Sequence, residues 1–142
     1  MSAKGKVFLD TNLFVYSYDD RDPIKRSMAR ELIRTVTFDR TGVVSYQVVQ
    51  EFFHVLLVKA AGKLNTEDAQ QVLATVFRPL LAVHSSVALF GDAIHLQKRH
   101  RLSWYDSLIV AAAQQSGCAI LYTEDLQQGQ RFGDLAVINP FR

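Results

Sequence analysis

The amino-acid sequence predicts an α/β protein, a three-layer α/β/α domain with a five-stranded parallel sheet. Short apolar runs of strand length alternate along the chain with longer segments in which apolar residues recur at helical spacing. The short runs are continuously apolar, as expected for strands that are covered by helices on both faces. The length of 142 residues, with 49% hydrophobic and 21% charged residues, fits a single domain over residues 1–142.

The first half of the chain contains two predicted strands and two predicted helices. The apolar run 7–9 reads as a buried strand that ends at Asp10. Asp22 and Pro23 form a helix start, with Asp as N-cap and Pro at the first helical position. Residues 42–45 form the second strand, and we expect Ser45 to cap a helix that runs to about Ala61 and stops at Gly62.

The second half continues the alternation. We expect Thr66 to cap a helix that ends before Pro79, and residues 80–83 to form a third strand. Ser86 and Ser103 each begin a helix, and Gly117 closes the second of these. The apolar runs 119–122 and 136–138 are the fourth and fifth strands.

Composition excludes several classes of protein. One cysteine cannot form an internal disulfide framework or a Cys-only zinc site, and it suits a reducing cytoplasm. Only a three-residue apolar run precedes Asp10, so we expect no signal peptide. The longest apolar stretch, residues 108–113, is too short to cross a membrane. The net charge of +2 neither requires nor excludes a nucleic-acid partner.

Acidic residues recur at places where ligand sites of parallel sheets form. Asp10 follows the first predicted strand, and Glu124 and Asp125 follow the fourth. Glu51 and Asp106 lie on helices that can lean over the same edge. In such sheets functional groups collect beyond the carboxyl ends of the strands. Gathered carboxylates repel each other, and a divalent cation such as Mg²⁺ or Mn²⁺ offsets that repulsion.

Each acid also has a structural interpretation. Asp10 and Asp125 can each stabilise a turn, and Glu51 can face solvent on an amphipathic helix. The spacing from Ser103 to Asp106 makes a good capping box. Convergence of the acids at one edge distinguishes a metal site from four separate structural roles.

In order along the chain, these residues resemble the motifs of the PIN-domain ribonucleases, in particular the VapC type of toxin from toxin–antitoxin pairs. The first motif is a hydrophobic strand followed by Asp-x-Asn, and the second is an acid in a helix. The third is an Asp that opens an Ala-rich helix, and the fourth is a Thr two positions before an acid. The matching segments are Val7–Asn12, Val49–Phe52, Trp104–Ala113 and Tyr122–Leu126.

The resemblance implies an Mg²⁺- or Mn²⁺-dependent endoribonuclease that cleaves RNA phosphodiester bonds with metal-activated water. It implies four acids as catalytic residues and metal ligands: Asp10, Glu51, Asp106 and Asp125. Glu124 adjoins Asp125, and the spacing to Thr123 favours Asp125 as the fourth acid. The implied accessory residues are Thr123 and Asn12, which would orient Asp10. The implied partners are RNA, a cognate antitoxin protein and a second copy of the chain in a homodimer.

Two further features bear on RNA binding. Lys98, Arg99 and Arg101 belong to the densest basic run and are candidate RNA contacts, although cations at a helix C-terminus also offset the helix dipole. Trp104 and Tyr105 flank the third acid and can stack on a base, but core packing is the expected use.

Other functions have less support in the sequence. Glu51 and His54 have the spacing of a di-iron motif, but strand signals oppose the helical bundle that such sites need. Asn12 stands where an aspartyl-nucleophile phosphatase needs a second Asp, and no phosphate-binding glycine loop is present. The remaining alternative is a non-catalytic RNA- or protein-binding module on the same fold, in which the acids serve as caps.

Overall fold

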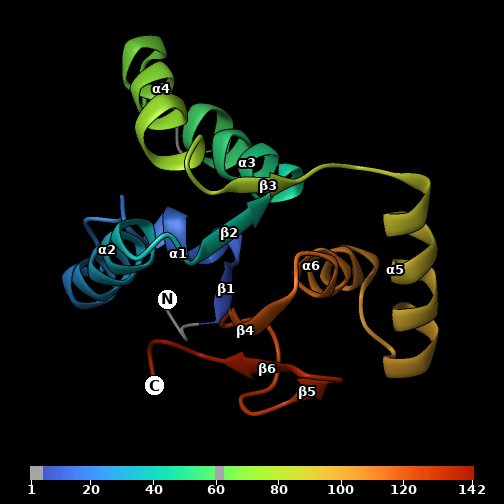
Figure 1. The fold of residues 1–142 in the computed structure, drawn as a ribbon. Helices are drawn as coiled ribbons and strands as arrows, with labels where there is room; N and C mark the ends of the chain where they lie inside the picture. Colours follow the sequence, from blue (N-terminus) through green and yellow to red (C-terminus); the bar gives the residue numbers. More distant parts are fainter. Residues whose placement is uncertain (1–4, 60–62) are drawn as a thin grey trace.

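A computed structural model describes residues 5–59 and 63–142 and shows a mixed sheet covered by helices (Figure 1). The strands are β1 (Lys6–Leu9), β2 (Gly42–Ser45), β3 (Leu81–Val83), β4 (Cys118–Tyr122), β5 (Arg131–Phe132) and β6 (Leu135–Ile138). The α-helices are α1 (Thr11–Tyr16), α2 (Pro23–Phe38), α3 (Tyr46–Phe53), α4 (Thr66–Val72), α5 (Val87–His100) and α6 (Trp104–Gln115). Two π-helical segments, η1 (His54–Lys59) and η2 (Leu73–Phe77), extend α3 and α4.

The sheet confirms the predicted α/β class and adds one strand to it. Its order is β3-β2-β1-β4-β6-β5, and every pair is parallel except β5 with β6. The prediction of five strands was therefore one short, because β5 has only two residues. Gly133 takes a φ of 62° in the two-residue turn after β5, a conformation that glycine adopts without steric cost.

Helices cover the sheet from two sides, as the sequence predicts. Figure 1 shows α1 and α2 on one side of the central strands and α6, with α5 outside it, on the other. The core combines strand residues such as Phe8, Leu9 and Leu121 with aromatic rings from the helices. The rings of Phe14 and Phe52 lie 4.9 and 5.0 Å from that of Phe77, which ties α1 and α3 to η2.

The observed N-cap residues match the predicted ones at three helix starts and differ from them at two. Asp22, Ser86 and Ser103 accept hydrogen bonds from the backbone at the starts of α2, α5 and α6. Ser45 was expected to cap α3, but its buried hydroxyl has no hydrogen-bond partner there. Asn65, rather than Thr66, caps α4 by accepting from the Asp68 amide at 2.8 Å. The expected stop of the long helix at Ala61 and Gly62 lies outside the described residues.

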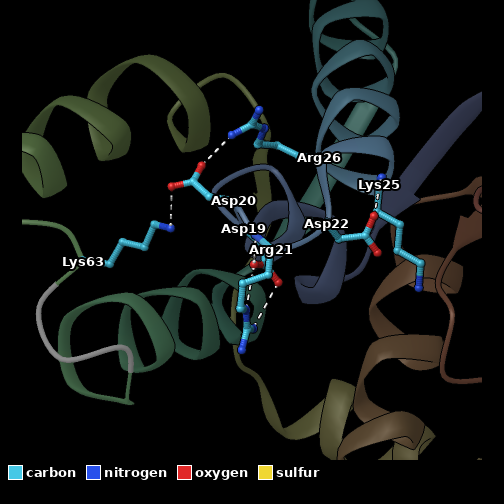
Figure 2. A network of polar contacts seen from close by, with 7 residues as sticks. All are labelled: Asp19, Asp20, Arg21, Asp22, Lys25, Arg26 and Lys63. Carbon is cyan, nitrogen blue, oxygen red and sulfur yellow. Dashed lines mark hydrogen bonds and ion pairs between the residues drawn. The ribbon is translucent and has the colours of Figure 1, made fainter.

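The connection between α1 and α2 is held by ion pairs (Figure 2). Asp20 accepts from Arg26 at 2.5 Å and from Lys63 at 3.3 Å, so it joins α2 to the segment before α4. Arg21 folds back onto Asp19. The Lys25 side chain runs away from this network (Figure 2), toward residues at the edge of the sheet. None of the described helices is long and apolar enough to span a membrane.

Candidate active site

The site begins where β1 and β4 end side by side. Leu9 pairs with Tyr122, and the Asp10 amide donates to the Tyr122 carbonyl at 3.0 Å. Thr123 is fully buried, and its hydroxyl donates to Asp10 Oδ2 at 2.8 Å. The same hydroxyl accepts from the Asp125 amide at 3.1 Å. Thr123 therefore connects the first and fourth acids of the predicted set.

Asp10 has both a structural and an electrostatic role. Its Oδ1 accepts from the Thr11 amide at 2.7 Å and so caps α1, a short helix that the sequence analysis did not include. Burial raises the pKa of the Asp10 carboxyl to about 7, while hydrogen bonds from Thr123 and the Thr11 amide partly offset the effect of burial. The charges of Asp125 and Glu51 raise this pKa further, so three of the four predicted acids interact electrostatically.

The carboxylates of Asp106 and Asp125 repel each other at the same site. Desolvation raises the pKa of the Asp125 carboxyl, and the charges of Asp106 and Glu124 raise it further. The Asp106 amide donates to Ser103 Oγ at 3.1 Å, which confirms the predicted cap at the start of α6. The cap uses the backbone of Asp106, and its half-buried side chain is left for the site.

Glu51 is held by a residue that the sequence analysis did not single out. Gln47 lies one turn earlier on α3 and is 5% exposed. Its Nε2 donates to Glu51 Oε1 at 2.8 Å and to the Tyr105 carbonyl at 3.2 Å. One buried amide thus joins the second acid to the helix turn that carries Asp106. In the sequence, the available signal was a glutamine four residues, or about one helical turn, before an acid.

Asn12 does not orient Asp10, contrary to the expectation. Both atoms of its amide are buried without a hydrogen-bond partner. The amide lies close enough to Asp125 to lower the pKa of that carboxyl, although it forms no hydrogen bond of normal geometry with it. The orienting contacts to Asp10 come from Thr123 and the Thr11 amide instead.

Glu124 is engaged elsewhere. It accepts hydrogen bonds from the Tyr16 hydroxyl and, at 2.8 Å, from Lys25 Nζ. Desolvation raises the pKa of Glu124, but the hydrogen bonds from Lys25 and Tyr16 outweigh it, so the net change is downward. The Glu124 hydrogen bond raises the pKa of Lys25 to about 12. These partners leave Asp125 as the acid of this loop that interacts with Asp10 and Asp106.

The donor set suits a hard divalent cation, because the four acids offer only oxygen ligands and the buried Asn12 amide has unmet hydrogen-bonding capacity. Within residues 5–59 and 63–142, however, no three His, Cys, Asp or Glu side chains lie close enough together to hold a metal ion. Mutual repulsion among carboxylates favours such a spread arrangement in the metal-free chain. Binding of a cation therefore requires side-chain movement, most easily by the exposed Asp125.

The basic and aromatic candidates are at the surface. Lys98 and Arg99 lie exposed in the last turn of α5, and Arg101 follows with a φ of 55°. Arg99 lines a hollow of about 590 Å³ with, among others, His95, His100 and Arg131. Core packing was the wrong expectation for two aromatics: Trp104 is 39% exposed and Tyr105 is 66% exposed.

Acidic side chains beyond the carboxyl ends of β1 and β4 mark the edge where ligand sites of parallel α/β sheets form, and comparison with known proteins specifies the family. The model of the PIN domain family matches residues 7–131, so the chain belongs to this family. The crystal structure of Mycobacterium tuberculosis VapC20, described as a sarcin–ricin loop cleaving toxin, has a similar fold. The TM-score is 0.62 at 20% sequence identity, over 84% of this chain and 90% of that chain. No curated protein matches the chain significantly.

Proposed function

We propose that this PIN-domain protein is a metal-dependent endoribonuclease and the toxin of a type II toxin–antitoxin pair. The observation that carries the proposal is the coupling of the acids: Asp10 is buried against Thr123, and its pKa responds to the charges of Asp125 and Glu51. Membership of the PIN domain family and the fold shared with VapC20 support a nuclease over other phosphate chemistry.

The chain's own residues have distinct roles in this proposal. Asp10, Glu51, Asp106 and Asp125 would hold Mg²⁺ or Mn²⁺, while Thr123 and Gln47 fix Asp10 and Glu51. A bound divalent cation supplies a more acidic water and stabilises negative charge on phosphate oxygens. Burial raises the pKa of Asp10 to about 7 without a cation, and a bound cation would favour its charged form and so offset the cost of burying it.

The surface around the site suits unpaired RNA. Exposed aromatic rings stack on unpaired bases, and Trp104 and Tyr105 immediately precede Asp106. Arg99 and the neighbouring basic residues Lys98 and Arg101 would contact RNA phosphates. A cognate antitoxin, a homodimer and a cytoplasmic location belong to the same proposal, and they rest on the likeness to VapC-type toxins.

The proposal is tested by brief expression of the protein in bacteria and mapping of the new RNA ends. We expect growth arrest and discrete new 5′-phosphate ends with the wild-type chain, and neither with Asp10→Asn. Identical RNA ends from both chains would contradict the proposal.

The alternative is a non-catalytic binding module, which the spread of the acids in the described residues favours. Crystals soaked with Mn²⁺ distinguish the two. A cation bound among the four acids supports the nuclease, whereas retained RNA binding with no bound cation and no cleavage supports the module.

A further inference from the structure

The loop after β4, residues 123–126, carries Asp125 and has no regular secondary structure. Two hydrogen bonds hold its beginning: the Thr123 amide donates to the Ile138 carbonyl at 3.1 Å, and the Asp125 amide donates to Thr123 Oγ1 at 3.1 Å. The side chain between them, Glu124, reaches in another direction, to α1 and α2.

Glu124 meets a cluster of three side chains that no catalytic role explains. Its carboxylate accepts from Tyr16 of α1 and from Lys25 of α2. The Lys25 ammonium also donates to the Tyr16 hydroxyl at 3.3 Å and lies 4.6 Å from the centre of the Tyr16 ring. Phe141 completes the cluster, with its ring 5.2 Å from the ammonium and 5.0 Å from the Tyr16 ring.

Burial and charge make this contact stronger than an ordinary surface ion pair. The side chains of Lys25 and Glu124 are only 31% and 25% exposed. Exposed ion pairs contribute little because water screens them and both side chains must be ordered. Here the two aromatic rings already restrict Lys25, so less side-chain freedom is lost when it pairs with Glu124. The contact also spans 99 residues, from the start of α2 to the end of β4.

We propose that the Lys25–Glu124 pair, supported by Tyr16, is a positioning device that fixes the 123–126 loop and thereby presents Asp125 to Asp10 and Asp106. Glu124 is then a positioning residue and not the fourth metal ligand. The consequence for metal binding rests on the proposed nuclease function, whereas the positioning of the loop can be tested independently of it.

The test compares Lys25→Met, Glu124→Gln and the double variant with the wild-type chain. Arg26→Met is the matched control, because Arg26 lies next along α2, is 32% exposed and pairs with Asp20, outside the acid set. Amide hydrogen exchange of the 121–128 segment reports the order of the loop without metal or RNA. We expect about tenfold faster exchange there in both single variants, no further increase in the double variant, and wild-type exchange in Arg26→Met.

Calorimetric titration with Mn²⁺ then measures the consequence at the site. We expect about tenfold weaker binding in Lys25→Met and Glu124→Gln, because residues that orient ligands typically change metal affinity by about 10- to 100-fold. If the loop of Lys25→Met exchanged at the wild-type rate, the positioning role would be overturned. Weaker RNA binding by that variant would not rescue it, because Lys25 would then contact RNA phosphate directly. If the loop exchanged faster in both single variants but the wild-type chain bound no Mn²⁺, the positioning role would be retained and the proposed nuclease rejected.

Discussion

Replacing Asp10 with asparagine should stabilise the metal-free protein at alkaline pH. The Asp10 carboxyl is 6% exposed, and its pKa rises from 3.8 to about 7, mainly because burial disfavours the charged form. The folded chain therefore binds this proton more tightly than the unfolded chain, and stability falls as the pH rises from about 4 to about 7. Each pH unit between the two pKa values is worth about 1.36 kcal/mol, so the full penalty above pH 7 is on the order of 4 kcal/mol.

Asparagine is neutral at every pH and avoids this penalty. Its amide offers one acceptor oxygen where the carboxylate offers two, so the hydrogen bond from either Thr123 or the Thr11 amide is lost, which costs about 1–2 kcal/mol. The net expectation is that Asp10→Asn is more stable than the wild-type chain by about 2–3 kcal/mol at pH 8 and no more stable at pH 4.

Urea unfolding in the presence of a chelator, at pH 4 and pH 8, measures this difference. The control is Asp134→Asn, which replaces an exposed carboxyl in the turn after β5 and should change stability by less than about 0.5 kcal/mol. Added Mg²⁺ should stabilise the wild-type chain and not Asp10→Asn. A wild-type chain that is the more stable of the two at pH 8 without metal would refute the reasoning.

Three further substitutions test separate parts of the account. Gln47→Leu removes both bonds of a buried amide, and we expect about tenfold weaker Mn²⁺ binding by calorimetry; unchanged affinity would mean that Glu51 needs no support. Tyr105→Ala should leave the unfolding midpoint within error but raise the KM for single-stranded RNA about tenfold, whereas the control Val87→Ala, at a residue that is still more exposed, should not. Phe52→Ala should cost about 3–5 kcal/mol in urea unfolding, because its ring is fully buried against Phe77; a smaller loss would show that the core repacks.

The strands and the position of Asp10 could be predicted because they depend on local pattern and on a general property of parallel sheets. Apolar runs 7–9 and 42–45 coincide with β1 and β2 to within one residue. Asp10 follows a strand directly, so its position at the sheet edge needed no knowledge of distant contacts.

The contacts that shape the site were not predictable in the same way. Tyr16 and Lys25 reach Glu124 across 108 and 99 residues, and nothing in their local sequence indicates that partner. Capping depends on atomic geometry, so Ser45 and Asn65 could not be ranked from residue type alone. Tyr105 is exposed because of the way α5 packs on α6. Such packing is a tertiary property, and the apolar character of a residue does not determine it.

The most direct test of the central claim is RNA cleavage by purified, metal-stripped protein during titration with Mg²⁺, with Asp106→Asn as the comparison. Asp106 interacts with Asp125 through its carboxylate, whereas its cap to Ser103 uses the backbone and survives the substitution. The account predicts cleavage that appears with Mg²⁺ in the wild-type chain and is lost at least a hundredfold in a folded Asp106→Asn variant, on the order expected when a metal ligand is removed. Equal Mg²⁺-dependent cleavage by both proteins would contradict it.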